Sequence, residues 1–370
     1  MKKKYLFIYG QINCGGAERV LIDILNNFDY SSNEVDLLQI IGGGDLCNEI
    51  PKDVNILTAW NSYSLNYKFA NKLSIKFSNN FLFKRKLQKI LCNKKYDVAI
   101  SFLEGMPLKI HSLVTYVAKW NYSWVHCDIY TNPYEKELFR KNDDLCAYNK
   151  MDSVICVSSD TKNAFIKRFP NYQSNINVIY NPLDFTKIKK LSTEYLVNNT
   201  DYTIVVVGRL VSQKRIDRVI RIAKKIKEEN LPITIQIIGD GVLKSKLSDY
   251  AKSLNIYKHI QFLGYLKNPY PYIKAANLLL STSEYEGFSL VICEAMGLDI
   301  PVVSTKTCGP IEILDNNKYG ILCDQNDDSI YSAIKLLYSD KELSQKYSKG
   351  GYDRVKMFSI ENCMNKIYKL

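Results

Sequence analysis

Apolar and polar positions along this chain alternate between two patterns. Short apolar runs, typical of buried strands, are followed by longer segments in which apolar residues recur every three or four positions, as on one face of a helix. The runs predict strands at residues 5–9, 35–40, 98–102, 153–157, 177–180, 203–207, 234–238, 259–263, 278–281 and 301–304. The longer segments predict helices, for example at residues 17–27, 161–168, 216–228, 243–253 and 290–296. Strands that alternate with helices indicate parallel sheets covered on both faces.

The alternation restarts near residue 200, which indicates two domains. Asn181-Pro182 interrupts the chain, and the polar stretch 191–200 separates the two series of strands. A length of 370 residues also exceeds that of one ordinary domain. We therefore expect an α/β protein with two doubly wound, Rossmann-like domains at residues 1–188 and 189–355. Ligands of such sheets bind beyond the carboxyl ends of the strands.

Composition narrows the class of protein. With 46% apolar and 24% charged residues the chain is typical of folded globular proteins, and no apolar run is long enough to span a membrane. The ten cysteines are scattered singly and only three histidines are present, so we expect neither a metal site nor redox chemistry. The apolar run at residues 5–9 is too short for a signal peptide, and a cytoplasmic protein is expected.

The net charge of +12 favours an anionic partner, and the positive charge is unevenly distributed. No acidic residue lies between Asp53 and Asp97, whereas this window contains Lys68, Lys72, Lys76, Lys84, Arg85, Lys86, Lys89, Lys94 and Lys95. Leu65, Phe69, Leu73 and Phe77 recur beside the first three lysines, so a helix there carries a cationic stripe next to an apolar one. Such a helix suits an anionic membrane surface. The alternative, which is commoner for a single helix, is an apolar stripe that faces the core.

The glycine and polar motifs of the C-terminal half all follow predicted strands. They are Gly208-Arg209-Leu210 with Lys214, Gly239-Asp240-Gly241, Phe262-Leu263-Gly264, the stretch from Glu286 to Glu294, and Gly309-Pro310-Ile311-Glu312. Because the carboxyl ends of parallel strands share one edge of a sheet, we expect these residues to gather around one ligand.

The stretch from Glu286 to Glu294 is the most informative of these motifs. Ser289 is predicted to cap a helix that begins there, which puts Glu294 in the second turn and Glu286 in the preceding loop. The N-terminus of a helix attracts an anion, whereas two carboxylates would repel a bare phosphate. The combination suits a ligand with both phosphate and hydroxyl groups, such as a nucleotide sugar.

The ordered set of motifs resembles the large "group 1" family of retaining GT-B glycosyltransferases. Glu286 and Glu294 match its E-x7-E element. Gly208 to Lys214 match G-R-L-x-x-x-K, Gly239 to Leu243 match G-D-G-x-L, and Gly15 to Arg19 resemble the family's G-G-A-E-R loop. The resemblance implies two facing domains, with the donor in the C-terminal domain and the acceptor in the N-terminal one. It also implies that a last helix, at about 356–370, packs back on the N-terminal domain.

The resemblance further implies roles for individual residues. Arg209 and Lys214 would grip the donor's diphosphate and make a metal unnecessary; the alternative is a pair of solvated loop charges. Glu286 would lie beside the transferred sugar as a catalytic residue. Glu294 would bind the ribose hydroxyls, unless it is an ordinary acid on a helix surface. The other donor-binding residues implied are Gly264, Leu266, Gly287, Phe288, Ser289 and Leu290.

Two features of the N-terminal half fit the same resemblance. Gly15 and Gly16 begin the helix at residues 17–27 and would contact donor or acceptor, although a lone Gly-Gly pair also fits an ordinary turn and no G-x-G-x-x-G fingerprint is present. His126 ends a strand-like run where many family members carry a histidine close to the reacting carbon, which implies a catalytic role. A lone histidine is more often structural.

We therefore expect a retaining, metal-independent hexosyltransferase that needs no cofactor. It would move a hexose or N-acetylhexosamine from a nucleotide sugar, which we expect to be UDP-linked, to a lipid-linked glycan in bacterial surface polysaccharide synthesis. Cys308 replaces the first glycine of a pair common in the family, in a loop that faces the donor sugar, so the sugar itself stays open. The basic window and the lipid acceptor imply a location on the inner face of the cell membrane.

Two other classes of protein stay open. A nucleotide-sugar epimerase has the same two-domain architecture but would have no acceptor site. A nucleic-acid-binding protein would account for the net charge, but the chain contains no recognisable reading motif and its cations lie beside an apolar stripe. We therefore expect no nucleic-acid partner.

Overall fold

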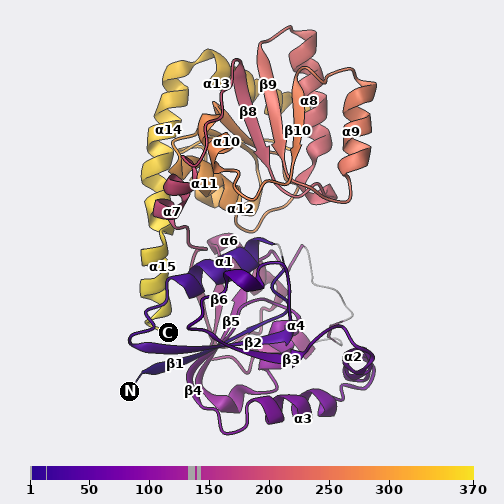
Figure 1. Ribbon diagram of the computed structural model, residues 1–370, viewed down its shortest axis with the longest axis vertical. Helices are drawn as coiled ribbons and strands as arrows, with labels where there is room; N and C mark the ends of the chain where they lie inside the picture. The colour runs from indigo at the N-terminus through magenta and orange to yellow at the C-terminus, as the bar shows by residue number, and fades with distance from the viewer. Residues whose placement is uncertain (1, 14, 132–137, 140–142) are drawn as a thin grey trace. The chain divides into compact units, whose positions relative to one another are not determined.

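The computed structural model describes residues 2–13, 15–131, 138–139 and 143–370. The chain forms two compact units, one of Met1–Pro182 with Ile360–Leu370 and one of Leu183–Ser359 (Figure 1). The first unit thus ends before residue 188, because the helix α7 (Phe185–Leu191) packs against helices of the second unit.

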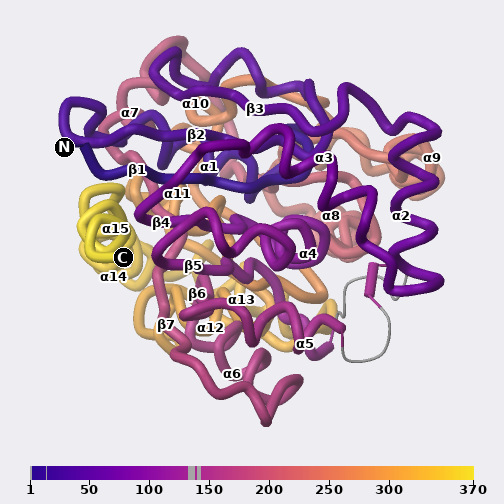
Figure 2. The backbone as a smooth tube through the Cα atoms, turned by 90° about the horizontal axis from the view of Figure 1, so that it is seen from below, coloured from indigo at the N-terminus to yellow at the C-terminus, as the bar shows by residue number. Residues whose placement is uncertain are grey.

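The first unit contains a seven-stranded sheet, whose strands follow one another in the order β3-β2-β1-β4-β5-β6-β7 (Figure 2). All neighbouring strands in it are parallel. Its strands are β1 (Lys3–Tyr9), β2 (Asn33–Ile41), β3 (Asn55–Trp60), β4 (Tyr96–Ser101), β5 (Ala118–Val125), β6 (Ser153–Cys156) and β7 (Asn175–Val178). Its helices are α1 (Gly16–Asn26), α2 (Leu65–Phe77), α3 (Phe81–Ile90), α4 (Met106–His111), α5 (Asp143–Tyr148), α6 (Ser159–Arg168) and α15 (Ile360–Ile367). The order of the strands reverses between β1 and β4, and ligands of doubly wound sheets bind at such a switch point.

The second unit contains a six-stranded parallel sheet in the order β10-β9-β8-β11-β12-β13. Its strands are β8 (Tyr202–Val207), β9 (Ile233–Ile238), β10 (Ile260–Gly264), β11 (Leu278–Ser281), β12 (Val302–Thr305) and β13 (Ile321–Cys323). Besides α7 its helices are α8 (Ile216–Glu228), α9 (Lys244–Ser253), α10 (Tyr270–Ala275), α11 (Leu290–Gly297), α12 (Cys308–Ile313), α13 (Asp327–Ser339) and α14 (Lys341–Val355). Here the order reverses between β8 and β11.

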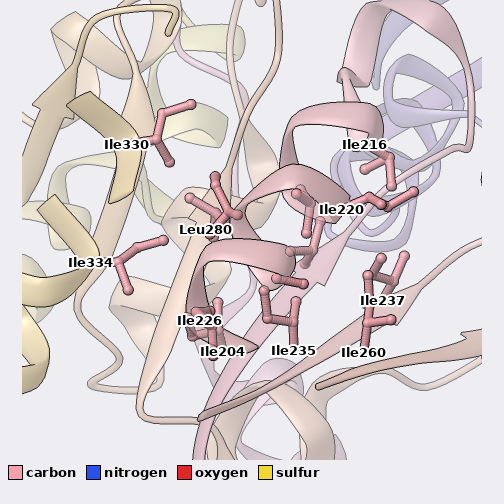
Figure 3. Packing of buried hydrophobic residues seen from close by; sticks show 14 of the residues in the cluster. Ile204, Ile216, Ile220, Ile226, Ile235, Ile237, Ile260, Leu280, Ile330 and Ile334 are labelled. Atoms are coloured by element: carbon pink, nitrogen blue, oxygen red, sulfur yellow. The ribbon is translucent and has the colours of Figure 1, made fainter. Parts of the chain in front are cut away.

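A core of branched aliphatic side chains holds the second sheet to its helices. Ile216, Ile220 and Ile226 occupy one face of α8 and pack with strand residues such as Ile204 and Ile235 (Figure 3). Burying one such side chain contributes about 1.5–3 kcal/mol. The close packing makes the sheet a rigid support for the loops at its carboxyl edge.

The chain ends within the first unit. Helix α15 packs near α1, and beyond it Tyr368 donates its hydroxyl hydrogen to the carbonyl oxygen of Asn27, at 3.4 Å, and accepts from the backbone N–H of Asp29, at 2.7 Å. Its ring meets that of Phe28 edge-on, with centroids 5.5 Å apart. The last residues are therefore tied to the loop between α1 and β2.

Candidate functional site

The loops that follow β8 and β11 flank the switch point of the second sheet and contact each other directly. Lys214, in the loop after β8, pairs with Glu286, in the loop after β11, at 2.5 Å between Nζ and Oε2. The hydroxyl of Ser283 donates to the same carboxylate oxygen at 3.1 Å. Both charged side chains are mostly buried, 20% and 14% exposed, so water screens the pair only in part.

Glycines allow the loops at this edge to approach closely. A Cβ atom on Gly239 would lie 1.9 Å from the carbonyl oxygen of Gly208, and one on Gly241 would lie 2.6 Å from that of Leu210. The loop after β9 therefore packs backbone to backbone on the loop after β8. The backbone N–H of Gly239 donates to the carbonyl oxygen of Gly264 at 2.8 Å, which adds the end of β10 to the same edge.

A further glycine fixes the loop that carries Glu286. The backbone N–H of Gly309, in α12, donates to the carbonyl oxygen of Glu286 at 2.9 Å. A Cβ atom on Gly309 would lie 2.8 Å from the Cα of Phe288 and 2.9 Å from the carbonyl oxygen of Gly287. The predicted donor-binding segment from Gly287 to Leu290 is thus held against α12.

The helix predicted after this loop is α11. Glu294 lies in its second turn, as expected, and accepts a hydrogen bond from the hydroxyl of Tyr270 at 3.1 Å. Ser289 is the N-cap residue, as predicted, but its side chain does not make the capping hydrogen bond expected of it. Tyr270 belongs to α10, and only the folding of the sheet brings it to Glu294.

Arg209 is exposed in the loop between β8 and α8, and no carboxylate of the described residues pairs with its guanidinium. The structure therefore brings Lys214, but not Arg209, into an ion pair with the acidic motif. Gly264 ends β10 with a φ of +73°, and Leu266 follows it as a half-buried residue. All of these positions are at the carboxyl edge of the second sheet.

In the first unit Gly15 is the N-cap residue of α1, and Gly16 begins the helix. A Cβ atom on Gly15 would lie 2.3 Å from a carboxylate oxygen of Glu18, so the loop and the first turn of α1 are packed together. The carboxylate of Glu18 also lies close enough to the buried Tyr9, at the end of β1, to help burial raise the pKa of that hydroxyl. Both glycines are therefore next to the switch point of the first sheet.

His126 directly follows β5. Burial lowers its pKa to about 3, so the imidazole is neutral at pH 7, and its ring lies 4.9 Å from that of Phe102 between centroids. Nε2 is buried and has no hydrogen-bond partner among the described residues. A neutral ring with an unpartnered nitrogen can accept a hydrogen bond from a hydroxyl group.

Glu104 is a residue of this region that the sequence analysis missed. Its carboxyl oxygens accept from the backbone N–H of His126 at 2.9 Å and from the thiol of Cys127 at 3.0 Å. Burial raises the pKa of Glu104. The signal that could have identified it is an acid directly after the strand at 98–102, on the far side of the switch point from β1.

The basic window forms α2 and α3. Tyr67, Ala70 and Ser74 of α2 face the core, and Ser64 caps this helix. Most of the apolar stripe faces solvent instead. Leu65, Phe69 and Phe77 are 84%, 58% and 60% exposed, Leu73 is half-buried, and Phe81 at the start of α3 is 61% exposed. Lys68, Lys72, Lys76, Lys84, Arg85 and Lys86 are exposed as well. The alternative of a core-facing stripe is therefore wrong for the exposed aromatic and aliphatic side chains.

Within the described part of the chain, no three His, Cys, Asp or Glu side chains are grouped so that they could hold a metal ion. None of the helices described combines the length and the apolar character that a membrane crossing requires.

Comparison with known families identifies the class of the protein. Residues 187–354 match the family described as Glycosyl transferases group 1, and residues 14–187 match Glycosyltransferase Family 4. The two matches together cover both units. The chain therefore belongs to the glycosyltransferases, with a group 1 second unit and a Family 4 first unit, and its two parallel-sheet units are those of the GT-B fold.

Individual relatives are similar over different lengths. An uncharacterised glycosyltransferase of Methanocaldococcus jannaschii is 29% identical over 252 residues, 58% of this chain and 62% of the relative. The N-acetylgalactosamine-N,N'-diacetylbacillosaminyl-diphospho-undecaprenol 4-alpha-N-acetylgalactosaminyltransferase of Campylobacter jejuni is 26% identical, over 97% of this chain and 96% of its own. The crystal structure of Anabaena HepE with UDP and glucose has a TM-score of 0.75 at 21% identity, over 99% and 98% of the two chains.

Proposed function

We propose that this protein is a retaining, metal-independent glycosyltransferase whose donor is a nucleotide sugar. The observation that carries the proposal is the pairing of Lys214 with Glu286 across the switch point of the second sheet. It puts a cation and a carboxylate side by side where doubly wound sheets bind nucleotides. The N-terminus of α11 begins a few residues further on and adds backbone donors.

Each group has a role in transfer. Arg209 and Lys214 bind the diphosphate and stabilise the charge that develops on it as the glycosidic bond breaks. Glu286 holds a hydroxyl group of the transferred sugar or stabilises positive charge on its ring. Glu294 accepts hydrogen bonds from the ribose, with Tyr270 fixing the carboxylate from behind. Since two cations neutralise the leaving group, the reaction requires no metal ion and no cofactor.

We assign the acceptor to the first unit. His126, neutral and with Nε2 unpartnered, accepts a hydrogen bond from the reacting hydroxyl or from the donor sugar. It is a weak base, because burial keeps its pKa near 3. The acceptor's proton therefore goes to the departing phosphate oxygen on the same face of the sugar, which keeps the anomeric configuration.

The names of the relatives support a substrate class. HepE was crystallised with UDP and glucose, and the Campylobacter relative is named for an undecaprenyl-diphosphate-linked acceptor. We propose a UDP-linked hexose or N-acetylhexosamine as the donor. The acceptor is a lipid-linked glycan for a bacterial surface polysaccharide.

A lipid-linked acceptor places the enzyme at a membrane, and the exposed face of α2 and α3 suits that location. The face combines the aromatic and aliphatic side chains Leu65, Phe69, Phe77 and Phe81 with the cations Lys68, Lys72, Lys76, Lys84, Arg85 and Lys86. Each cation near an anionic lipid surface contributes about 1 kcal/mol. Apolar side chains that enter the interface add to this attraction. The protein is thus peripheral on the inner leaflet.

Vesicle co-sedimentation tests the membrane location. Vesicles of phosphatidylglycerol and phosphatidylcholine should sediment the protein at low salt and release much of it at high salt. Phe69→Ser with Phe77→Ser, or Lys68→Glu with Lys72→Glu, should abolish sedimentation. Lys252→Glu with Lys274→Glu, in the second unit, removes the same charge and should not. If the fraction of protein that sediments with the vesicles changed neither with salt nor in the α2 variants, this location would be refuted.

Transfer itself is tested with a panel of nucleotide sugars and an undecaprenyl-diphosphate glycan, in the presence of EDTA. The proposal predicts transfer with retention, seen as the anomeric coupling of the new bond by NMR. Conversion of a nucleotide sugar to its epimer without an acceptor would instead establish the epimerase. Transfer that EDTA abolishes would contradict the metal-independent mechanism.

A further inference from the structure

Thr282 is a buried residue at the end of β11 that connects the two loops of the donor site. It is 2% exposed. Its hydroxyl lies 2.9 Å from the carbonyl oxygen of Lys214 and 3.2 Å from that of Arg215, so it is shared between these two acceptors. Arg215 has a φ of +49°, which is rare for a residue with a side chain and persists only where neighbours hold the backbone.

Arg218 holds the same residue from the side of α8. It is 5% exposed, and its Nη1 donates to the carbonyl oxygen of Thr282 at 3.0 Å. Its Nη2 donates to Oε1 of Gln325 at 3.3 Å, and Nε2 of Gln325 donates to the carbonyl oxygen of Glu284 at 2.9 Å. The guanidinium of Arg218 therefore holds the carbonyl group of Thr282 directly and that of Glu284 through Gln325, both in the segment that leads to Glu286.

An arginine at this buried position costs free energy of desolvation. Burial lowers the pKa of Arg218, because the charged form loses hydration, and the nearby Arg215 acts in the same direction. Asp217, Glu284 and Asp327 partly offset this effect. No carboxylate of the described residues forms an ion pair with Arg218, so its hydrogen bonds go to uncharged oxygens. An apolar side chain would pack on α8 without this desolvation.

We propose that Thr282 and Arg218 are positioning residues for glycosyl transfer, which fix the loop of Lys214 relative to the loop of Glu286. The inference rests on the proposed function, because it assumes that these two loops bind the donor's diphosphate and sugar. A displacement of about 1 Å in a catalytic group can reduce the rate about 100-fold. Both side chains are buried and hydrogen-bond within the protein, so this role requires no contact with the substrate.

Matched substitutions of buried threonines test the role of Thr282. Thr282→Val keeps the shape and removes the hydroxyl, and we expect kcat to fall at least about tenfold with an unchanged KM for the acceptor. Thr282→Ser restores the hydroxyl and should recover most of kcat. Thr203→Val removes a buried hydroxyl that donates to the carbonyl oxygen of Asp201 at 3.0 Å, at the opposite end of the sheet. It should lower Tm like Thr282→Val but leave kcat unchanged.

Arg218→Lys and Arg218→Gln test the guanidinium. Lysine keeps the charge but cannot reach both acceptors, so both variants should lose kcat by similar factors. The proposal is overturned if Thr282→Val loses only stability, if Thr282→Ser is as slow as Thr282→Val, or if both Arg218 variants keep the wild-type kcat. Calorimetric titration of the wild type with UDP distinguishes failure of the proposed function from failure of the positioning role. Wild-type protein that neither binds UDP nor transfers sugar refutes the proposed function. Full activity in the variants refutes only the positioning role.

Discussion

Glu286 contributes both a charged side chain and a fixed backbone position to the proposed donor site. Its carboxylate accepts from Lys214 and from Ser283, while its backbone carbonyl accepts from Gly309. The side chain is therefore already oriented before a substrate arrives. In the proposed function, the diphosphate of the donor would compete for Lys214 and so leave one oxygen of the Glu286 carboxylate available for a sugar hydroxyl.

Glu286→Gln removes the charge and keeps the size of the side chain. We expect kcat/KM to fall by about 100- to 1000-fold, the effect of losing one preorganised charge-stabilising group. Glu228→Gln, a substitution of the same kind at a carboxylate side chain that is 59% exposed on α8, should leave kcat/KM and Tm unchanged. Steady-state kinetics with circular dichroism as a control for folding make the comparison. A Glu286→Gln enzyme with wild-type rates would exclude a catalytic role for this residue.

At the level of elements, the sequence predicted the repeating framework well. Every predicted strand and helix is present, because each follows from a short apolar run or from a clear helical period, such as that of α8. Strands β3 and β13 were not predicted, and of β5 only the end before His126 was identified as strand-like. In β5 the exposed Lys119 and Trp120 precede buried residues, and β13 has only three residues, so neither gives a sustained pattern.

The site was predictable only in part. The order of the glycine and acidic motifs locates it at the carboxyl edge of the second sheet, and the ion pair of Lys214 with Glu286 joins two of the motifs. Tyr270, Thr282 and Arg218 lie outside every motif. Their contacts depend on which strands are neighbours in the folded sheet, and a single sequence contains no direct signal for that.

Two glycine substitutions distinguish a close approach between elements from ordinary packing. Gly309→Ala in α12 would push a methyl group against the backbone of Gly287 and Phe288, so we expect loss of activity and about 1–3 kcal/mol of lost stability. Gly350→Ala in α14 meets only the ring of Tyr319, at 3.4 Å, and should stabilise its helix by roughly 0.5–1 kcal/mol. Urea denaturation measures both. Equal effects from both substitutions would contradict the described packing of α12.

At the scale of the whole molecule, buried titratable groups of the first unit make stability depend on pH. The first unit contains His111, fully buried between Ser101 and Asn121, with its two ring nitrogens at 3.1 and 3.0 Å from their side-chain oxygens. Burial lowers the pKa of His111 to about 4. In the unfolded chain the ring titrates near 6.5.

Between pH 6.5 and 4 the unfolded chain therefore binds a proton that folded His111 does not, and the free energy of unfolding falls as the pH falls. The expected slope is about 1.4 kcal/mol per pH unit for each such histidine. His126 acts in the same direction, and Glu104, whose pKa is raised, opposes them above pH 4.5. All three tryptophans belong to the first unit, so their fluorescence reports on it. His111→Gln should be less stable at pH 7 and show a shallower slope; an unchanged slope would exclude this linkage.

In the proposed function, the loops after β8 and β11 bind the diphosphate and ribose of a nucleotide sugar. Calorimetric titration with UDP in the presence of EDTA tests it most directly. Arg209→Gln and Glu294→Ala should each weaken binding about tenfold or more, since each removes a charge-assisted hydrogen bond, while Glu228→Gln should bind like the wild type. Absence of UDP binding in the wild type, or equal affinities in all four proteins, would contradict the account.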